Sequence, residues 1–157
     1  MQLVIFDWKW TLYHPPSKQL LPGAKELIEH LHAKDVKMVL VGKDQGGNMD
    51  EIVDKLDVRK YFHDIRFIKS AKTPEIFKEY IKELVPDQVW VIGDRIRGEI
   101  DTGNKVNART VWMKVGNFSN EGPRSKEEEP DYTFHSLHDL LGLFGGAGDS
   151  AETEADG

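Results

Sequence analysis

Short apolar runs alternate with amphipathic stretches along most of this chain of 157 residues, and no other feature constrains the fold as strongly. The apolar runs predict strands over Leu3–Phe6, Lys37–Val41, Ile65–Ile68, Gln88–Ile92, Arg109–Met113 and Tyr132–Phe134. Apolar residues at helical spacing predict helices over residues 23–34, 49–56, 73–84, 96–106 and 136–143. Strands separated by such helices are typical of βαβ units and a parallel sheet. We therefore expect a three-layer α/β fold with a mostly parallel sheet, in which the Leu3–Phe6 strand is central.

The chain divides into one domain and a short tail. Residues 1–144 carry all of the predicted strands and helices, and their length suits a single domain. Residues 117–130 are polar and charged, which is typical of a surface loop. Residues 145–157 contain acidic side chains but no large apolar one, so we expect a disordered acidic tail.

Composition excludes several classes of protein. Cysteine is absent, which excludes disulfides, thiolate zinc sites, iron–sulfur clusters and cysteine nucleophiles. The formal net charge is −6, and without a basic excess a nucleic-acid partner is not expected. No apolar run approaches the roughly 20 residues that a membrane span needs, and the N-terminus lacks the basic region of a secretory signal. We expect a soluble, cytoplasmic protein that binds neither nucleic acid nor membrane.

Acidic side chains follow two of the predicted strands. Asp7 comes directly after Leu3–Phe6, Asp94 comes just after Gln88–Ile92, and Glu99 lies five residues further on. In doubly wound sheets the active crevice lies at the carboxyl ends of the strands. Carboxylates that converge there form a hard oxygen site suited to Mg²⁺. For each aspartate taken singly, a helix cap or a turn is the alternative role.

Four loops occur in a telling order along the chain. They are Asp7-Trp8-Lys9-Trp10-Thr11, then Gly42-Lys43, then the stretch Lys69–Phe77 that contains Lys72, and then Gly93-Asp94 with Glu99. Their order and spacing resemble the motifs of the haloacid dehalogenase (HAD) superfamily of aspartate-nucleophile hydrolases. The resemblance covers residues 3–143 and implies a single Rossmannoid domain.

The resemblance also implies a role for each matching residue. Asp7 maps to the nucleophile that attacks phosphorus. Lys72 maps to the lysine that pairs with the phosphoryl group, with Lys69 as the alternative. The implied Mg²⁺ ligands are Asp7, the backbone carbonyl of Lys9, and Asp94, with Glu99 acting through water. Thr11, Gly42 and Lys43 map to substrate-binding positions.

The chain departs from the family pattern at two positions. Lys9 stands where the family has the aspartate that acts as general acid and base, and an ammonium is a poor acid near neutral pH. Loss of that role lowers the rate by about 10²–10⁴. Gly42 replaces a residue whose hydroxyl contacts the phosphoryl group, although backbone N–H groups at Gly46 and Gly47 offer a residual anion cradle.

The spacing of the motifs leaves no room for an inserted cap domain. Only residues 12–41 separate the first two motifs, and one helix and one strand account for the next gap. We therefore expect an open site, and by resemblance such capless members often act on large substrates. Trp8 is a candidate core residue. Trp10 replaces the family's usual glycine and would either plug the crevice or offer a stacking platform.

These observations predict a Mg²⁺-dependent phosphohydrolase whose activity is weakened because Lys9 replaces the general acid. Such an enzyme would favour leaving groups that depart unaided, such as acyl or aryl phosphates, and its substrate would be a phosphorylated small molecule or a phosphoprotein. The alternative is a catalytically inactive pseudoenzyme that serves as a binding module. Carbon–halogen hydrolysis is a third interpretation, because family members with that activity also lack the second aspartate. The oligomeric state stays open.

Overall fold

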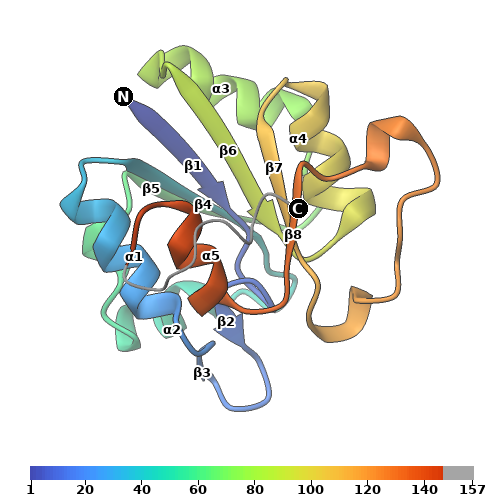
Figure 1. Cartoon of the computed structure of the whole chain (residues 1–157). Coiled ribbons are helices and arrows are strands. Elements are labelled where there is room, and N and C mark those ends of the chain that lie inside the picture. Colours follow the sequence, from blue (N-terminus) through green and yellow to red (C-terminus); the bar gives the residue numbers. More distant parts are fainter. Residues whose placement is uncertain (147–157) are drawn as a thin grey trace.

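Six parallel strands form the central sheet of the computed structural model, which describes residues 1–146 (Figure 1). The strands are β1 (Gln2–Phe6), β4 (Lys37–Lys43), β5 (Asp64–Ile68), β6 (Gln88–Gly93), β7 (Arg109–Met113) and β8 (Tyr132–Phe134). Their order is β5-β4-β1-β6-β7-β8, and every neighbouring pair is parallel. The predicted parallel sheet with an interior Asp7 strand is therefore confirmed. Most of the predicted acidic tail, residues 147–157, lies outside the described residues.

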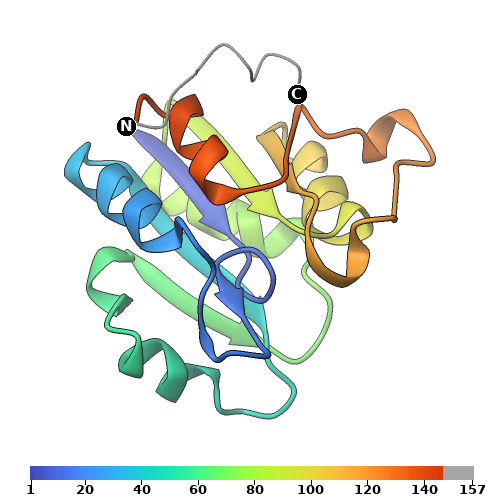
Figure 2. The same cartoon turned by 60° about the horizontal axis from the view of Figure 1, so that its bottom comes forward.

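Helices cover both faces of the sheet (Figures 1 and 2). They are α1 (Ala24–Ala33), α2 (Met49–Lys55), α3 (Pro74–Leu84), α4 (Asp101–Lys105) and α5 (Leu137–Leu143). Buried side chains of α1, α2 and α5 share one apolar cluster, whereas those of α3 belong to the cluster on the opposite face. The three-layer α/β architecture is thus confirmed.

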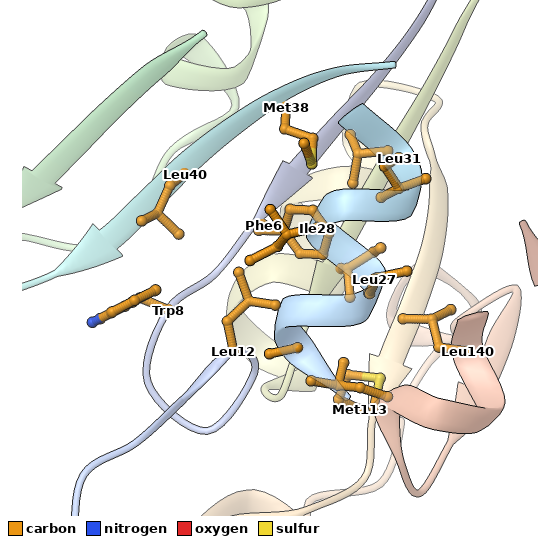
Figure 3. Packing of buried hydrophobic residues seen from close by; sticks show 14 of the residues in the cluster. Phe6, Trp8, Leu12, Leu27, Ile28, Leu31, Met38, Leu40, Met113 and Leu140 are labelled. Carbon is orange, nitrogen blue, oxygen red and sulfur yellow. The ribbon is translucent and has the colours of Figure 1, made fainter. Parts of the chain in front are cut away.

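Alternation along β1 supplies both halves of the core. Val4 and Phe6 face the α1 side, while Leu3 and Ile5 face the α3 side, as expected when successive residues of a strand point to opposite faces. Figure 3 shows the side chains of α1 packed around Phe6. Because β1 is buried on both faces, Asp7, the residue that follows it, is held in a fixed position at the carboxyl end of this interior strand.

The segment between β1 and α1 folds into a small hairpin. Its strands are β2 (Tyr13–His14) and β3 (Gln19–Leu20), which the sequence pattern did not predict. Within residues 1–146 no cap domain interrupts the chain between these elements, as expected. None of the helices in this part of the chain is long and apolar enough to cross a membrane.

The structure adds detail to two predictions about the second half of the chain. The helix expected over residues 96–106 is a π-helical turn over Ile96–Ile100 followed by the short α4. Residues 117–130 are more than a solvated loop, because they contain a 3₁₀ turn at Lys126–Glu128 and the buried carboxylate of Glu128. Charged side chains there are held by ion pairs that a composition argument cannot foresee.

Candidate functional site

Three carboxylates converge at the carboxyl ends of β1 and β6. Asp7 extends the pairing of these strands, since its N–H donates to the carbonyl of Ile92 over 2.9 Å. One oxygen from each of Asp7, Asp94 and Glu99 lies within 4.8 Å of the others. All three residues are buried. The strand order therefore brings together acids that lie 92 residues apart at the extremes, since residue 7 meets residue 99.

The π-helical turn and a glycine bring Glu99 into this cluster. A Cβ atom at Gly93 would lie 2.5 Å from the Glu99 carboxylate and 2.6 Å from its Cβ. Only glycine leaves space for Glu99 at the end of β6. The Trp112 indole N–H donates to the carbonyl of Asp94 over 3.1 Å and holds the same loop from β7. Single π-turns of this kind often occur at functional sites.

Lys72 supplies the positive charge of the cluster. Its Nζ donates to Asp7 Oδ1 over 2.5 Å and to Glu99 Oε2 over 2.9 Å, and its side chain is only 6% exposed. Lys69, the alternative in the sequence, is exposed and does not line the pocket. The structure thus brings Lys72, and not Lys69, to the nucleophile position.

Burial and mutual repulsion perturb the acids strongly. Desolvation, reinforced by the negative charge of Asp7, raises the pKa of Asp94 well above its usual range. The same two causes raise the pKa of Glu99, while Lys72 opposes the shift. Burial by itself would lower the pKa of Lys72, but Asp7 and Glu99 outweigh it and raise that pKa, so the side chain remains an ammonium ion.

The residues of the cluster fit a divalent cation. Glu99 Oε1 is buried and has no hydrogen-bond partner among residues 1–146, which leaves one carboxylate oxygen free for a metal-bound water or a metal. Oxygen donors alone, in a group with excess negative charge, match the preference of Mg²⁺. Asp7, Asp94 and Glu99 would hold the ion, and the carbonyl of Lys9 stays a predicted fourth donor.

A pocket of about 330 Å³ opens above the cluster. Lys9, Trp10 and Lys43 are among the residues that line it. Trp10 has a left-handed backbone conformation with φ of 63°, and its ring lies against Gly116, where a Cβ atom would come within 2.7 Å of the indole. Trp10 therefore forms part of the pocket wall, whereas Trp8 is fully buried in the core.

Arg95 and Arg97 also line the pocket, and sequence reasoning missed them. Arg97 pairs with Glu121 and Glu128, and Arg95 pairs with Glu121 and stacks on Phe118 with 4.3 Å between the guanidinium carbon and the ring centre. Glu121 also accepts the backbone N–H of Ile96. The only signal in the sequence was the charge of residues 121–129, which the surface-loop interpretation left unused.

Two of the predicted substrate-binding residues do not reach the pocket. Thr11 is fully buried, and its hydroxyl donates to Asp7 Oδ2 over 3.4 Å, so it contacts Asp7 without lining the pocket. Gly42 is also buried, and a Cβ atom there would lie 2.7 Å from the ring of Phe67 and 3.1 Å from the Cβ of Trp8. Lys43, the third, lines the pocket.

One of the two N–H groups of the expected anion cradle after β4 is already used. The carboxylate of Asp44 accepts the backbone N–H of Gly47 over 2.9 Å and that of Met49 over 2.9 Å. Asp44 is itself buried. The N–H of Gly47 is therefore not available to a phosphoryl group, because a side chain from within the same loop uses it.

Comparison with known proteins gives a consistent picture of this fold. Residues 40–140 match the family model described as HAD-hydrolase-like. Glyceraldehyde 3-phosphate phosphatase from Pyrococcus furiosus is 25% identical over 128 residues, which span 77% of this chain and 52% of that protein. The protein of the same name from Methanopyrus kandleri is 25% identical over 93 residues and is covered over 40% of its length. The chain thus spans about half the length, or less, of these curated relatives.

Solved structures match over more of the chain. The D,D-heptose 1,7-bisphosphate phosphatase from B. bronchiseptica, complexed with magnesium and phosphate, superposes with a TM-score of 0.74 at 16% identity and covers 92% of this chain and 98% of that one. A predicted phosphoglycolate phosphatase from Haemophilus somnus gives a TM-score of 0.69 at 20% identity, over 80% of this chain and 57% of its own. At these identities the likeness concerns the fold.

Proposed function

The chain belongs to the HAD-like hydrolases, and from this premise we propose that it is a Mg²⁺-dependent phosphohydrolase with Asp7 as nucleophile. The observation that carries the proposal is the convergence of Asp7, Asp94, Glu99 and Lys72 at the bottom of one pocket. A buried acidic cluster with a single ammonium ion is costly to fold, and its perturbed pKa values are typical of a functional site.

In the first step a carboxylate oxygen of Asp7 attacks phosphorus. The new bond to phosphorus forms while the bond to the leaving oxygen breaks, and the leaving group departs with the electron pair. Lys72, already within hydrogen-bond distance of Asp7, neutralises negative charge on the equatorial phosphoryl oxygens. Thr11 holds the other oxygen of Asp7 and so fixes the direction of attack. When bound, Mg²⁺ would supply additional positive charge opposite the same oxygens.

Lys9 determines which leaving groups can depart. An ammonium ion cannot deliver a proton efficiently at neutral pH, but it stabilises a leaving group that departs as an anion. We therefore expect acyl and aryl phosphates to react, and alkyl phosphates to react poorly. The second step requires a base to activate water for attack on the aspartyl-phosphate, and Lys9 cannot serve as one. The phosphoenzyme is expected to accumulate.

The substrate is expected to be a small phosphorylated molecule. The pocket volume of about 330 Å³ suits a ligand of that size. The relatives named above act, by their names, on glyceraldehyde 3-phosphate and on a heptose bisphosphate. A phosphoprotein is the alternative substrate, since no cap domain covers the pocket in residues 1–146.

The test is a pre-steady-state experiment with 4-nitrophenyl phosphate and acetyl phosphate. With Mg²⁺ present, we expect a burst of nitrophenolate close to one equivalent per active site, followed by a slow steady rate. Intact-mass spectrometry after acid quench should show one added phosphoryl group, and Asp7→Asn should lack both signals because an amide is not a nucleophile here. The absence of burst, adduct and turnover in the unmodified protein would overturn the proposal.

One observation favours a second function, that of a pseudoenzyme that binds anionic ligands without turning them over. Lys72 bridges Asp7 and Glu99 and so occupies an oxygen of the nucleophile, while Lys9 stands at the acid position. In this case Mg²⁺ or a phosphorylated ligand would still bind, as measured by calorimetry, while the burst experiment gave no product.

A further inference from the structure

We propose that the pocket has a second anion-binding subsite, formed by Lys9 and Lys43, that selects phosphate compounds with another negative group on the side of the leaving oxygen. The inference deepens the proposed phosphohydrolase and rests on it. It concerns a groove beside the main pocket that the carboxylate cluster and Lys72 do not line.

The groove shares two residues with the pocket above Asp7. Its volume is about 280 Å³, and its lining consists of Lys9, Lys43, Gln45 and Gly46. Lys9 and Lys43 also line the main pocket, so the two spaces meet at these side chains. A substrate whose phosphoryl group lies at Asp7 can therefore extend past the two lysines into the groove.

Neither lysine is neutralised within residues 1–146. Lys9 and Lys43 form no salt bridge and no side-chain hydrogen bond there, in contrast to Arg97, another residue of the pocket lining, which pairs with Glu121 and Glu128. Two ammonium groups that line the same narrow space repel each other. A ligand that brings negative charge between them removes this repulsion and gains two charge-assisted hydrogen bonds.

The loop that forms the groove is held rigidly from within. Asp44 lies between Lys43 and Gln45 in the sequence, but its carboxylate is buried and accepts two backbone N–H groups at the start of α2. Its negative charge is thus directed into the loop. The exposed side of the loop offers the ammonium of Lys43 and the amide of Gln45, both of which can donate to an anion.

The chemical class follows from the position of the two lysines. The reacting phosphoryl group requires the Asp7 side of the pocket, so the second negative group belongs to the part of the substrate that leaves. A carboxylate and a second phosphate share this chemistry, and either would reach both ammonium groups. We therefore infer a substrate with two anionic groups, one of which is transferred while the other is held by Lys9 and Lys43.

The test compares three aryl phosphates that differ in the second anion: phenyl phosphate, 3-carboxyphenyl phosphate and 1,3-phenylene bisphosphate. We expect KM to be about tenfold lower for at least one of the two compounds with a second anionic group than for phenyl phosphate, with a smaller change in kcat. One hydrogen bond to a charged group is worth about a factor of ten. The preference should diminish as ionic strength rises. The arm that shows the larger preference identifies carboxylate or phosphate as the second group.

Three variants separate the subsite from general charge effects. Lys43→Gln should remove the preference, measured within each variant as the KM of phenyl phosphate divided by the KM of the compound with two anionic groups, and Lys43→Arg should retain it. Lys78→Gln, which removes an exposed lysine on α3, should leave the preference unchanged. The subsite is overturned, and the proposed function stands, if phenyl phosphate gives a burst but the protein shows no preference for the compounds with a second anionic group. The same holds if the Lys43→Gln variant retains the preference.

A binding measurement covers the case in which no compound reacts. The Asp7→Asn variant can be titrated calorimetrically with the same three compounds. A compound with a second anionic group should bind more tightly than phenyl phosphate, and adding Lys43→Gln should abolish the difference. This result would support the subsite even if the proposed hydrolysis failed. Equal binding of all three compounds would overturn it.

Discussion

The two halves of the pocket are held in different ways. On the metal side, Asp7, Asp94, Glu99 and Lys72 are buried and contact one another, so each position depends on the rest. On the leaving-group side, Lys9 and Lys43 point into the pocket without a paired group in residues 1–146. The half that keeps the motif carboxylates is the half whose charged groups contact one another, with Lys72 between Asp7 and Glu99. The other half can change its chemistry without unfolding the site.

The largest effect expected from this comparison is the gain from Lys9→Asp. Because Lys9 has no ion pair to lose among residues 1–146, the substitution should fold normally and restore a group that can protonate a leaving oxygen. We expect hydrolysis of alkyl phosphates to rise by about 10²–10⁴-fold. Steady-state phosphate release with glycerol phosphates, in the presence of Mg²⁺, measures the gain.

The matched control for this gain is Lys9→Asn. It removes the positive charge without supplying an acid, so it should leave alkyl phosphates unreactive. An equal gain in both variants would mean that the ammonium ion obstructs the site and that the missing acid is unimportant. No gain in either would mean that the metal side is itself incompetent.

A substitution on the metal side should instead lower the stability of the folded protein. Lys72→Met leaves the carboxylates of Asp7 and Glu99 buried without a counter-charge, which costs about 3–5 kcal/mol of unfolding free energy when one partner of a buried pair is removed. Urea unfolding at pH 7 measures the loss, and added Mg²⁺ should recover part of it. Lys69→Met, three residues away and exposed, should change the stability by no more than about 0.5 kcal/mol. Equal losses in both variants would contradict the role given to Lys72.

The metal side was also the more predictable half from the sequence. Asp7 and Asp94 follow apolar runs, and the parallel sheet implied by the alternation brings the ends of neighbouring strands together. The sequence favours Lys72 over Lys69 only because Lys72 lies closer to the next predicted helix. The choice depends on loop conformation, which short-range patterns do not specify.

The rest of the pocket depends on contacts between distant segments. Arg97 owes its position to Glu121 and Glu128, which come from a stretch whose composition alone indicates a solvated loop. Asp44 fills the cradle expected at Gly47, which becomes visible only when the loop is folded. Gly42 looked like a lost hydroxyl, whereas the folded chain shows that Phe67 and Trp8 take up the space of a side chain.

The position of Gly42 leads to a third prediction, which is that a single substitution cannot introduce a hydroxyl there without loss of stability. Gly42→Ser places a Cβ atom 2.7 Å from the Phe67 ring and should destabilise the protein by about 1–3 kcal/mol, as overpacking usually does. Thermal unfolding measures the loss, and a combined Phe67→Leu substitution should recover part of it. Gly46→Ser is the control in the same loop, where the nearest atom lies 3.7 Å from the new Cβ and the cost should be within about 0.5 kcal/mol. A tolerated Gly42→Ser would show that the packing of Phe67 and Trp8 around this position can adjust.

The smallest effect should come from Asp94, whose charge the metal-free fold disfavours. Its pKa in the folded protein is raised, chiefly by burial and then by Asp7, whereas an unfolded aspartate titrates at about 3.9. Above pH ~4 the folded state therefore binds more protons than the unfolded state, and stability falls as pH rises toward the folded pKa. Asp94→Asn removes this dependence.

We therefore expect Asp94→Asn to match the unmodified protein near pH 4 and to be more stable by about 1–2 kcal/mol at pH 8 in EDTA. Mg²⁺ should offset most of this difference, because it stabilises the folded carboxylate cluster of the unmodified protein by about 1.4 kcal/mol at ten times its Kd, and the variant has lost a ligand. Urea titrations at pH 4, 6 and 8, with EDTA and with Mg²⁺, measure both effects. A variant that is less stable at pH 8 without metal would mean that Asp94 is already compensated by Lys72, and that the metal side needs no cation from solution to balance its charges.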